Sequence, residues 1–450
     1  MSEITRRTFV NTSVKSAAAL GAGASALSAA RLAQAGSANA KVVLALIGAG
    51  GRGSGLIAGM TGLENVQTKC VCEVNDSRGG AAIRSLESTQ GFAPKRVVDI
   101  REVLDDKDVN AVVVATPEHW HALATVWACQ AGKDVYVEKN ISLTVWEGRK
   151  MVEAARKYDR IVQAGTQNRS APYASSAREY IASGQLGKVV HVKVFNLLGG
   201  GRWNPSADRD LPSGLDWDRW LGPAPERPYN PGRMGWYSWW DYSGGALAGD
   251  GSHQLDLARM VIGDPPHPKA VYCAGGNLAW GSERETPEMQ AVTYDFGEFT
   301  MTCENSTFPP YTSKTPGQIR MGDEFPSWPQ NATRIEIYGT KQMMYVGRHG
   351  GGWQVMVGGG KVVAQEPGIH PDRWHQPNFI DCIRSRKQPN ADVEQGHLSA
   401  SLVHLGNLAY RAGNRQLVFD AVTESFTNDE SANRMLKPEY RKHYRIPDEV

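Results

Sequence analysis

A short apolar run that ends in a group of glycines constrains the fold of this chain more than any other feature. Residues 41–47, KVVLALI, are rich in β-branched side chains, which is typical of a strand buried on both faces of a parallel sheet. The residues that follow, GAGGRG, fit the spacing G-x-G-x-x-G. Between a strand and a helix, the first glycine allows a tight turn, the second lets a pyrophosphate approach the backbone, and the third lets the helix pack against the strand. The pattern predicts a dinucleotide site, in which we expect the cofactor to contact Gly48, Gly50, Gly51, Arg52 and Gly53.

An acidic residue stands where the adenosine ribose of such a cofactor is expected. Glu73 lies near the end of a second strand-like run, residues 67–74, and 20 residues beyond Gly53. A carboxylate at this place hydrogen-bonds both ribose hydroxyls and repels a 2′-phosphate. The sequence therefore predicts NAD in preference to NADP. The nearby Arg78 weakens this inference if it contacts the cofactor, but an ordinary solvated arginine is the favoured interpretation.

Strand-like and helix-like segments continue to alternate as far as residue 164, which predicts a parallel, doubly wound sheet and a Rossmann domain over residues 41–164. Residues 165–450 then form a second domain. In such sheets the ligand lies beyond the carboxyl ends of the strands. Two predicted strands, 111–115 and 134–137, end next to polar residues, so we also expect cofactor contacts from Thr116, Pro117, His121, Glu138 and Lys139.

The first forty residues differ in character from the rest of the chain. Arg6 and Arg7 precede a weakly apolar stretch, residues 16–30, and Ala38-Asn39-Ala40 provides a small-x-small cleavage site. Residues 1–40 therefore resemble a twin-arginine signal peptide, which implies export of the folded protein to the periplasm or another extracytoplasmic space. The alternative is an N-terminal helix or disordered segment that stays attached. No later run approaches the 18 or so apolar residues of a membrane span, so we expect no stable membrane insertion once the signal is removed.

Charge and cysteine content exclude several other kinds of protein. The chain of 450 residues has 49 Lys and Arg against 47 Asp and Glu, so no strong positive field would draw it to nucleic acid. Its six cysteines are widely scattered and predict neither a disulfide framework nor a metal or redox pair. His119 and His121 lack a third ligand at suitable spacing, so we expect no metal.

Seven motifs resemble, in order, those of the glucose-fructose oxidoreductase, inositol dehydrogenase and rhizopine-catabolism (Gfo/Idh/MocA) family. They are residues 45–53, 115–121, 135–140, 163–167, 244–256, 378–384 and 396–407. The resemblance implies an N-terminal Rossmann domain, a C-terminal α+β domain with a large open, mainly antiparallel sheet, and a homodimer or homotetramer. It also implies an NAD(P)-dependent oxidoreductase of sugars or polyols, with Gln167 at the cofactor and Lys139 near both the nicotinamide and the reacting hydroxyl.

Two residues depart from the family pattern. Asn140 replaces the proline that follows the lysine in relatives, which removes a rigid residue but keeps Lys139 itself. Relatives commonly have an Asp four residues before the catalytic His; here Gly249 occupies that place and Asp250 stands three residues before His253. Either Asp250 substitutes, or the site is not that of a standard dehydrogenase.

Hydride removal from a secondary alcohol needs a group that takes the hydroxyl proton, and histidine is the usual group near neutral pH. We expect His253 to be this base, Lys139 to polarise the oxygen, and Asp250 to complete the catalytic set. Asp256 either orients His253 and contacts substrate, or pairs locally; the two alternatives are open. Aromatic rings stack on sugar rings, and we expect Trp236 and Trp239 to line a carbohydrate pocket.

The function that the sequence favours is an exported NAD(P)-dependent oxidoreductase acting on a hydroxyl of a sugar, polyol or glycoside. One alternative is a redox-neutral enzyme that oxidises C3 transiently with bound NAD, eliminates a glycoside bond and reduces the ring again. This alternative gains weight because NAD recycling is poor outside the cytoplasm, which also favours a tightly bound cofactor. A non-catalytic sugar-binding protein on the same fold is a further alternative.

Overall fold

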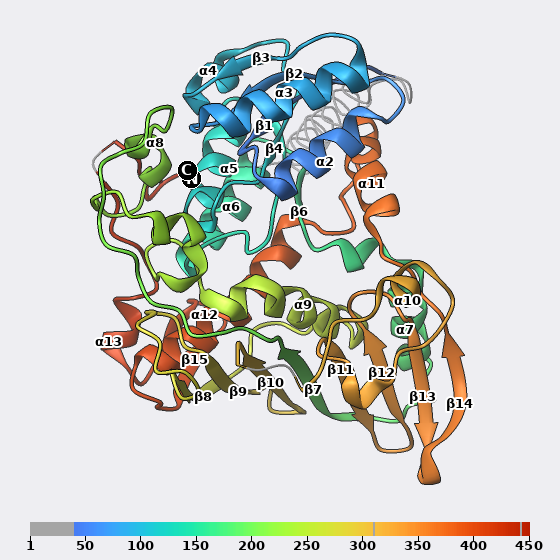
Figure 1. Cartoon of the computed structure of the whole chain (residues 1–450). Coiled ribbons are helices and arrows are strands. Elements are labelled where there is room, and N and C mark those ends of the chain that lie inside the picture. Colours follow the sequence, from blue (N-terminus) through green and yellow to red (C-terminus); the bar gives the residue numbers. More distant parts are fainter. Residues whose placement is uncertain (1–39, 309–310, 442) are drawn as a thin grey trace, which may run out of the picture.

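A computed structural model describes residues 40–308, 311–441 and 443–450, which form two β-sheets (Figure 1). The predicted signal peptide, apart from Ala40, lies outside the described residues. None of the helices in the described part of the chain has both the length and the apolar character that a membrane span requires.

The first sheet has six parallel strands in the order β3-β2-β1-β4-β5-β6. The strands are β1 (Val42–Ile47), β2 (Val66–Cys72), β3 (Lys95–Val97), β4 (Ala111–Val114), β5 (Asp134–Val137) and β6 (Val162–Ala164). The intervening helices are α2 (Gly51–Thr61), α3 (Asp76–Gln90), α4 (Ile100–Asp105), α5 (His121–Gln130) and α6 (Val145–Lys157). Strand order reverses between β1 and β4, so a ligand crevice is expected at their carboxyl ends.

Both faces of this sheet are buried. Along β1, Leu44 and Leu46 belong to one hydrophobic core, whereas Ala45 and Ile47 belong to another on the opposite face. Because successive side chains of a strand point to opposite faces, a strand buried on both sides must be apolar throughout, as residues 42–47 are. The predicted doubly wound parallel sheet is confirmed.

The second sheet has ten strands in the order β14-β13-β12-β11-β7-β10-β9-β8-β15-β16. Its strands pair antiparallel except for the parallel pair β7 and β10. The strands are β7 (Val189–Leu197), β8 (Ala270–Gly276), β9 (Met289–Asp295), β10 (Thr300–Ser306), β11 (Arg334–Gly339), β12 (Met343–Gly347), β13 (Trp353–Val357), β14 (Lys361–Glu366), β15 (Leu417–Asp420) and β16 (Ser425–Phe426). This confirms the expected second half with a large, mainly antiparallel sheet.

The remaining helices connect and cover the two sheets. They are α7 (Pro172–Ala182), α8 (Trp217–Leu221), α9 (Ser252–Val261), α10 (Gly317–Met321), α11 (Asp372–Ser385), α12 (Val393–Arg411) and α13 (Glu430–Asn433). Figure 1 shows α9 and α12 between the two sheets, and α12 contacts α6 on the first side and β8 on the second. The carboxyl ends of the parallel strands therefore face helix α9 and the preceding residues, which carry the 244–256 motif.

Candidate active site

The glycine turn between β1 and α2 has the three features that a dinucleotide requires. Gly48 has a φ of +90°, and a Cβ there would lie 2.8 Å from the backbone of Ala115 and Thr116. A Cβ at Gly53 would lie only 2.1 Å from the carbonyl oxygen of Gly48. At Gly50, by contrast, no atom lies within 4 Å of the Cβ position. The backbone beside the first turn of α2 is therefore open to an anionic group, which helix N-termini favour.

Glu73 stabilises this turn and lines the adjoining pocket. Its side chain follows β2, is 7% exposed, and accepts hydrogen bonds from the backbone N–H of Ala49 at 2.7 Å and of Asn75 at 2.9 Å. The same pocket is lined by Gly48, Gly50 and Thr116. A ribose placed over the glycine turn would meet the Glu73 carboxylate, so these residues fit the predicted cofactor.

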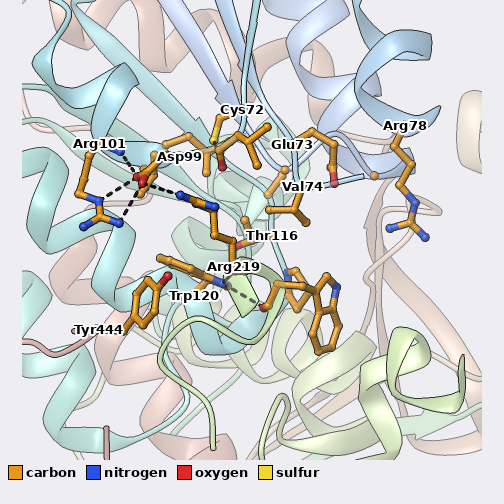
Figure 2. Close-up of a pocket in the computed structure, with 18 of the residues that line it drawn as sticks. Cys72, Glu73, Val74, Arg78, Asp99, Arg101, Thr116, Trp120, Arg219 and Tyr444 are labelled. Atoms are coloured by element: carbon orange, nitrogen blue, oxygen red, sulfur yellow. Dashed lines mark hydrogen bonds and ion pairs between the residues drawn. The ribbon is translucent and has the colours of Figure 1, made fainter. Parts of the chain in front are cut away.

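Arginines surround the same pocket, and most have acidic partners. Asp99 accepts from Arg101 at 2.9 Å and from Arg219 at 3.4 Å. Figure 2 shows Glu73 between this group on one side and Arg78 on the other. Glu73, the residue that favours NAD, and Arg78 thus line one pocket.

A second set of predicted cofactor residues is linked at the end of β5. Arg52 donates from Nε to Glu138 at 2.9 Å and from its other nitrogens to Asp372 of α11. Gln167 donates to the same Glu138 oxygen at 3.3 Å. These contacts join the first turn of α2, the end of β5 and the segment after β6 into one wall.

Both ring nitrogens of His121 contact backbone carbonyl oxygens at two strand ends. Its Nδ1 lies 2.7 Å from the carbonyl oxygen of Asn140, and its Nε2 lies 2.8 Å from that of Thr116. The ring therefore ties the segment after β4 to the segment after β5. Pro117, which precedes it, lines the cofactor pocket.

Lys139 extends from the end of β5 toward the second domain. Its Nζ donates to the carbonyl oxygen of Gly249 at 2.6 Å and lies 5.9 Å from the centre of the Tyr237 ring. Burial by itself would lower the pKa of Lys139, but Tyr237 and the carboxylates of Glu118, Glu138 and Asp250 outweigh it, so the pKa is raised. Lys139 is therefore cationic throughout the physiological range.

His253 lies in the first turn of α9 and is 5% exposed. Burial, followed by the positive charges of Arg348 and Lys139, places the pKa of His253 well below its usual value. The ring is consequently neutral at neutral pH, and its buried Nδ1 has no hydrogen-bond partner among the described residues. A neutral imidazole is the form that can accept a proton.

Asp250 lies in a π-helical turn, Leu247–Gly251, that leads into α9. Its carboxylate forms an ion pair with Lys314 and lies 3.6 Å from a guanidinium nitrogen of Arg348. Burial would raise its pKa, but Arg348 and Lys314 together lower it, so the carboxylate is ionised. Lys139 and Asp250 each perturb the other's pKa, and Lys139 also perturbs that of His253; the structure therefore brings the three predicted catalytic residues together.

The three candidate substrate residues have different surroundings. Asp256 is fully buried and accepts from Arg169 Nε and from Ser399 Oγ, both at 2.7 Å. These partners are distant in the sequence, so the pairing is not the local one that the sequence suggested as an alternative. Trp236 lines the cofactor pocket beside Glu73. Trp239 is 8% exposed and belongs to an aromatic cluster against which Trp236 also packs.

Sequence reasoning missed two charged residues of this region. Glu118, just beyond β4, is 3% exposed and accepts from Ser243 Oγ at 3.0 Å and from the Gly244 N–H at 3.1 Å. Burial raises its pKa to about 7, against the opposing effect of Lys139. The sequence could have indicated Glu118, because it directly follows a buried strand. No sequence pattern indicates Arg348, which lies beyond β12, because only tertiary folding brings it close to Asp250.

Elsewhere, one group of metal-ligating side chains occurs among the described residues: His267, His397 and Glu424. Both imidazole Nε2 atoms lie within hydrogen-bond distance of Glu424, at 2.9 and 2.7 Å. Arg149 donates to the same carboxylate at 2.7 Å, so the Arg149 guanidinium already provides a positive charge at Glu424. All six cysteines are buried and unbridged.

Comparison with known proteins identifies both halves of the chain. A family model described as "Oxidoreductase family, NAD-binding Rossmann fold" matches residues 42–166, and a second, "Oxidoreductase family, C-terminal alpha/beta domain", matches residues 176–274 and 360–446. The chain belongs to the Gfo/Idh/MocA oxidoreductase family. Its first half is accordingly an NAD-binding Rossmann domain, and the predicted cofactor, NAD, is confirmed at this level.

Individual relatives are distant. Levoglucosan dehydrogenase of Pseudarthrobacter phenanthrenivorans is 27% identical over 196 residues, which are 44% of this chain and 43% of that protein. The 1,5-anhydro-D-fructose reductase of Ensifer adhaerens is 26% identical over 217 residues, 46% of this chain and 57% of that protein. The chain thus spans about half the length of these curated relatives. The WlbA dehydrogenase of Bordetella pertussis, solved with NADH and UDP-GlcNAcA, shares the fold with a TM-score of 0.59 and 19% identity, over 85% of this chain and 98% of that one.

Proposed function

We propose that this protein is an NAD-dependent oxidoreductase that acts on a hydroxyl-bearing carbon of a sugar, polyol or glycoside. The observation that carries the proposal is the meeting of Lys139, neutral His253 and ionised Asp250 at the carboxyl edge of an NAD-binding sheet. The sugars and the polyol that appear in the names of relatives, such as levoglucosan and scyllo-inositol, support the substrate class.

In this proposal the nicotinamide supplies the hydride acceptor, and the protein handles the proton. The substrate C–H bond breaks with its electron pair leaving as hydride, the O–H proton passes to the neutral ring of His253, and a carbonyl forms. Cationic Lys139 donates a hydrogen bond to the substrate oxygen and stabilises the negative charge that develops there. Asp250 keeps Lys314 and Arg348 paired beside the base.

The test begins with protein purified from a native-like host with its N-terminus intact. The protein is denatured, the released nucleotide is identified by mass, and the folded protein is then assayed against sugars and polyols. NAD bound reversibly, with NADH formed on sugar addition, is the expected result. Stoichiometric NAD retained through purification, with sugars altered but no net NADH, would support the redox-neutral alternative. A protein with no affinity for NAD would overturn the proposal.

Export by the twin-arginine route is also part of the proposal, supported by Arg6, Arg7 and the small-residue cleavage site. Cell fractionation is expected to place the protein outside the cytoplasm, and replacement of both arginines by lysine to retain it inside. Equal distribution of the two forms would refute this.

We further propose a homodimer or homotetramer built on the ten-stranded sheet, supported by exposed apolar side chains on adjacent strands, such as Tyr272 of β8 and Val418 of β15. Light scattering of the purified protein, with Tyr272→Glu as the disrupting variant, tests the assembly. A monomeric wild-type protein would refute it.

A further inference from the structure

Arg348 is a buried guanidinium whose charge is poorly compensated. Its side chain is 9% exposed, and its nearest acidic atom, an oxygen of Asp250, is 3.6 Å away. It donates no hydrogen bond to any residue that the structure describes, and its Nε is wholly buried without a partner. A buried charge whose single carboxylate partner lies 3.6 Å away and is shared with Lys314 is unfavourable unless another group compensates it.

Arg169, another buried arginine, shows what a fully paired guanidinium looks like. The Arg169 side chain is 3% exposed, and it donates to Asp256 at 2.7 Å and to Asp264 at 2.9 Å. Arg169 thus has two carboxylates, whereas Arg348 shares its single carboxylate with Lys314. Arg169 and Arg348 are buried to a similar degree. They differ in the number of carboxylates that pair with them.

The surroundings of Arg348 hold more positive than negative charge. Arg320 and Arg52 are close enough to lower its pKa, and Lys139 is close enough to lower that of Asp250. The carboxylates on the Arg52 side, Glu138 and Asp372, are already engaged by Arg52 itself. Asp250 is therefore the only acidic group, among the described residues, that faces Arg348 as an ion-pair partner.

We propose that Arg348 binds an anionic group of the substrate, a carboxylate or a phosphate, beside the carbon that reacts at His253. This inference rests on the proposed function and narrows its substrate class to acidic sugars. The planar guanidinium presents N–H groups in a fork that fits two anionic oxygens, and burial strengthens such a charge-assisted pair. A neutral hydroxyl can accept hydrogen bonds from Arg348, but it carries no charge and so adds nothing to the partial compensation by Asp250.

Anion binding is tested first, on NADH-loaded protein at constant ionic strength. Acetate and inorganic phosphate serve as probes, with acetamide as the neutral control, and the readout is the change in Tm. We expect at least one anion to raise the Tm of the wild type by a few degrees more than that of Arg348→Gln, and acetamide to act equally on both. The anion with the larger Arg348-dependent effect distinguishes a carboxylate from a phosphate site. Arg334→Gln, a half-buried arginine of β11 paired with Glu336, is the matched control and is expected to respond like the wild type.

Substrate preference is tested next, with matched pairs such as glucuronate and glucose, or glucose 6-phosphate and glucose. Arg348→Gln is expected to lower the ratio of kcat/KM for the acidic over the neutral sugar by about 10- to 100-fold, and Arg348→Lys to restore part of it. Equal anion effects on the Tm of wild type and variant would overturn the inference. If no sugar reduces NAD but the anion effect depends on Arg348, the proposed function fails and the anion site stands.

Discussion

Glu118 allows a pH-dependent prediction whose size follows from the structure. Its carboxyl group is buried beside Ser243 and Gly244, and its pKa is raised from 4.5 to about 7. A raised folded-state pKa means that the folded protein holds this proton more tightly than the unfolded chain. Stability from this group is therefore full below pH 4.5, declines as pH rises toward 7, and stays at the lower level above it. The difference of roughly 2.5 pKa units corresponds to about 3 kcal/mol.

The variant Glu118→Gln cannot ionise and should lack this decline. Urea unfolding of wild type and variant at pH 5 and pH 8 gives four free energies of unfolding, and the other titrating groups cancel in their double difference. We expect the wild type to lose about 2.5 kcal/mol more than the variant between the two pH values, because part of the full difference is already lost at pH 5. Glu87→Gln, on the exposed face of α3, is the control and should behave as the wild type. The same pH dependence in wild type and Glu118→Gln would refute the reasoning.

Four further substitutions test other parts of the site. Gly50→Ala is expected to fold normally but to bind NADH at least about tenfold more weakly in a fluorescence titration. The control Gly55→Ala, where the added Cβ also meets open space, should keep its NADH affinity. Equal loss of affinity in both variants would contradict the proposed pyrophosphate position. Glu73→Gln should weaken NADH binding by about 10- to 100-fold through loss of charge-assisted bonds, and unchanged affinity would exclude ribose contact. His253→Gln should lower kcat/KM by about 10²- to 10⁴-fold with little change in NADH affinity, so activity within tenfold of wild type would remove it as the base. Arg169→Met should destabilise the fold by about 3–5 kcal/mol in urea unfolding because it leaves buried Asp256 uncompensated, and a stable variant would argue against that ion pair.

The Rossmann half was predictable because its strands and its glycine turn are specified by residues that are close together in the sequence. Each buried parallel strand must be apolar along its whole length, so strands such as 42–47 and 111–114 are visible as short runs. The glycine spacing and Glu73 depend on the same local order of strand, turn and helix. The positions of Gly48 and Gly53 then follow from close backbone approaches that leave no room for a Cβ.

The second half was not predictable in the same detail because its order is set by distant pairings. β7 lies between β10 and β11, whose residues come more than 100 positions later in the chain. Neither hydrophobic periodicity nor turn residues specify such neighbours, and the fold of this half came only from the family resemblance. Arg348 illustrates the result: its chemical setting exists only once β12 is placed next to the turn that carries Asp250.

The displaced aspartate now has a physical explanation. Gly249 stands where relatives led us to expect a carboxylate, and its carbonyl oxygen accepts the hydrogen bond from Lys139. A carbonyl holds the ammonium in position without neutralising it, so Lys139 keeps its charge for the substrate oxygen of the proposed reaction. The π-helical turn meanwhile directs Asp250 toward Lys314 and Arg348. The one-residue shift therefore gives two groups different roles. The backbone carbonyl of Gly249 positions Lys139, and the carboxylate of Asp250 pairs with Lys314 and with Arg348, which in our proposal binds an acidic substrate.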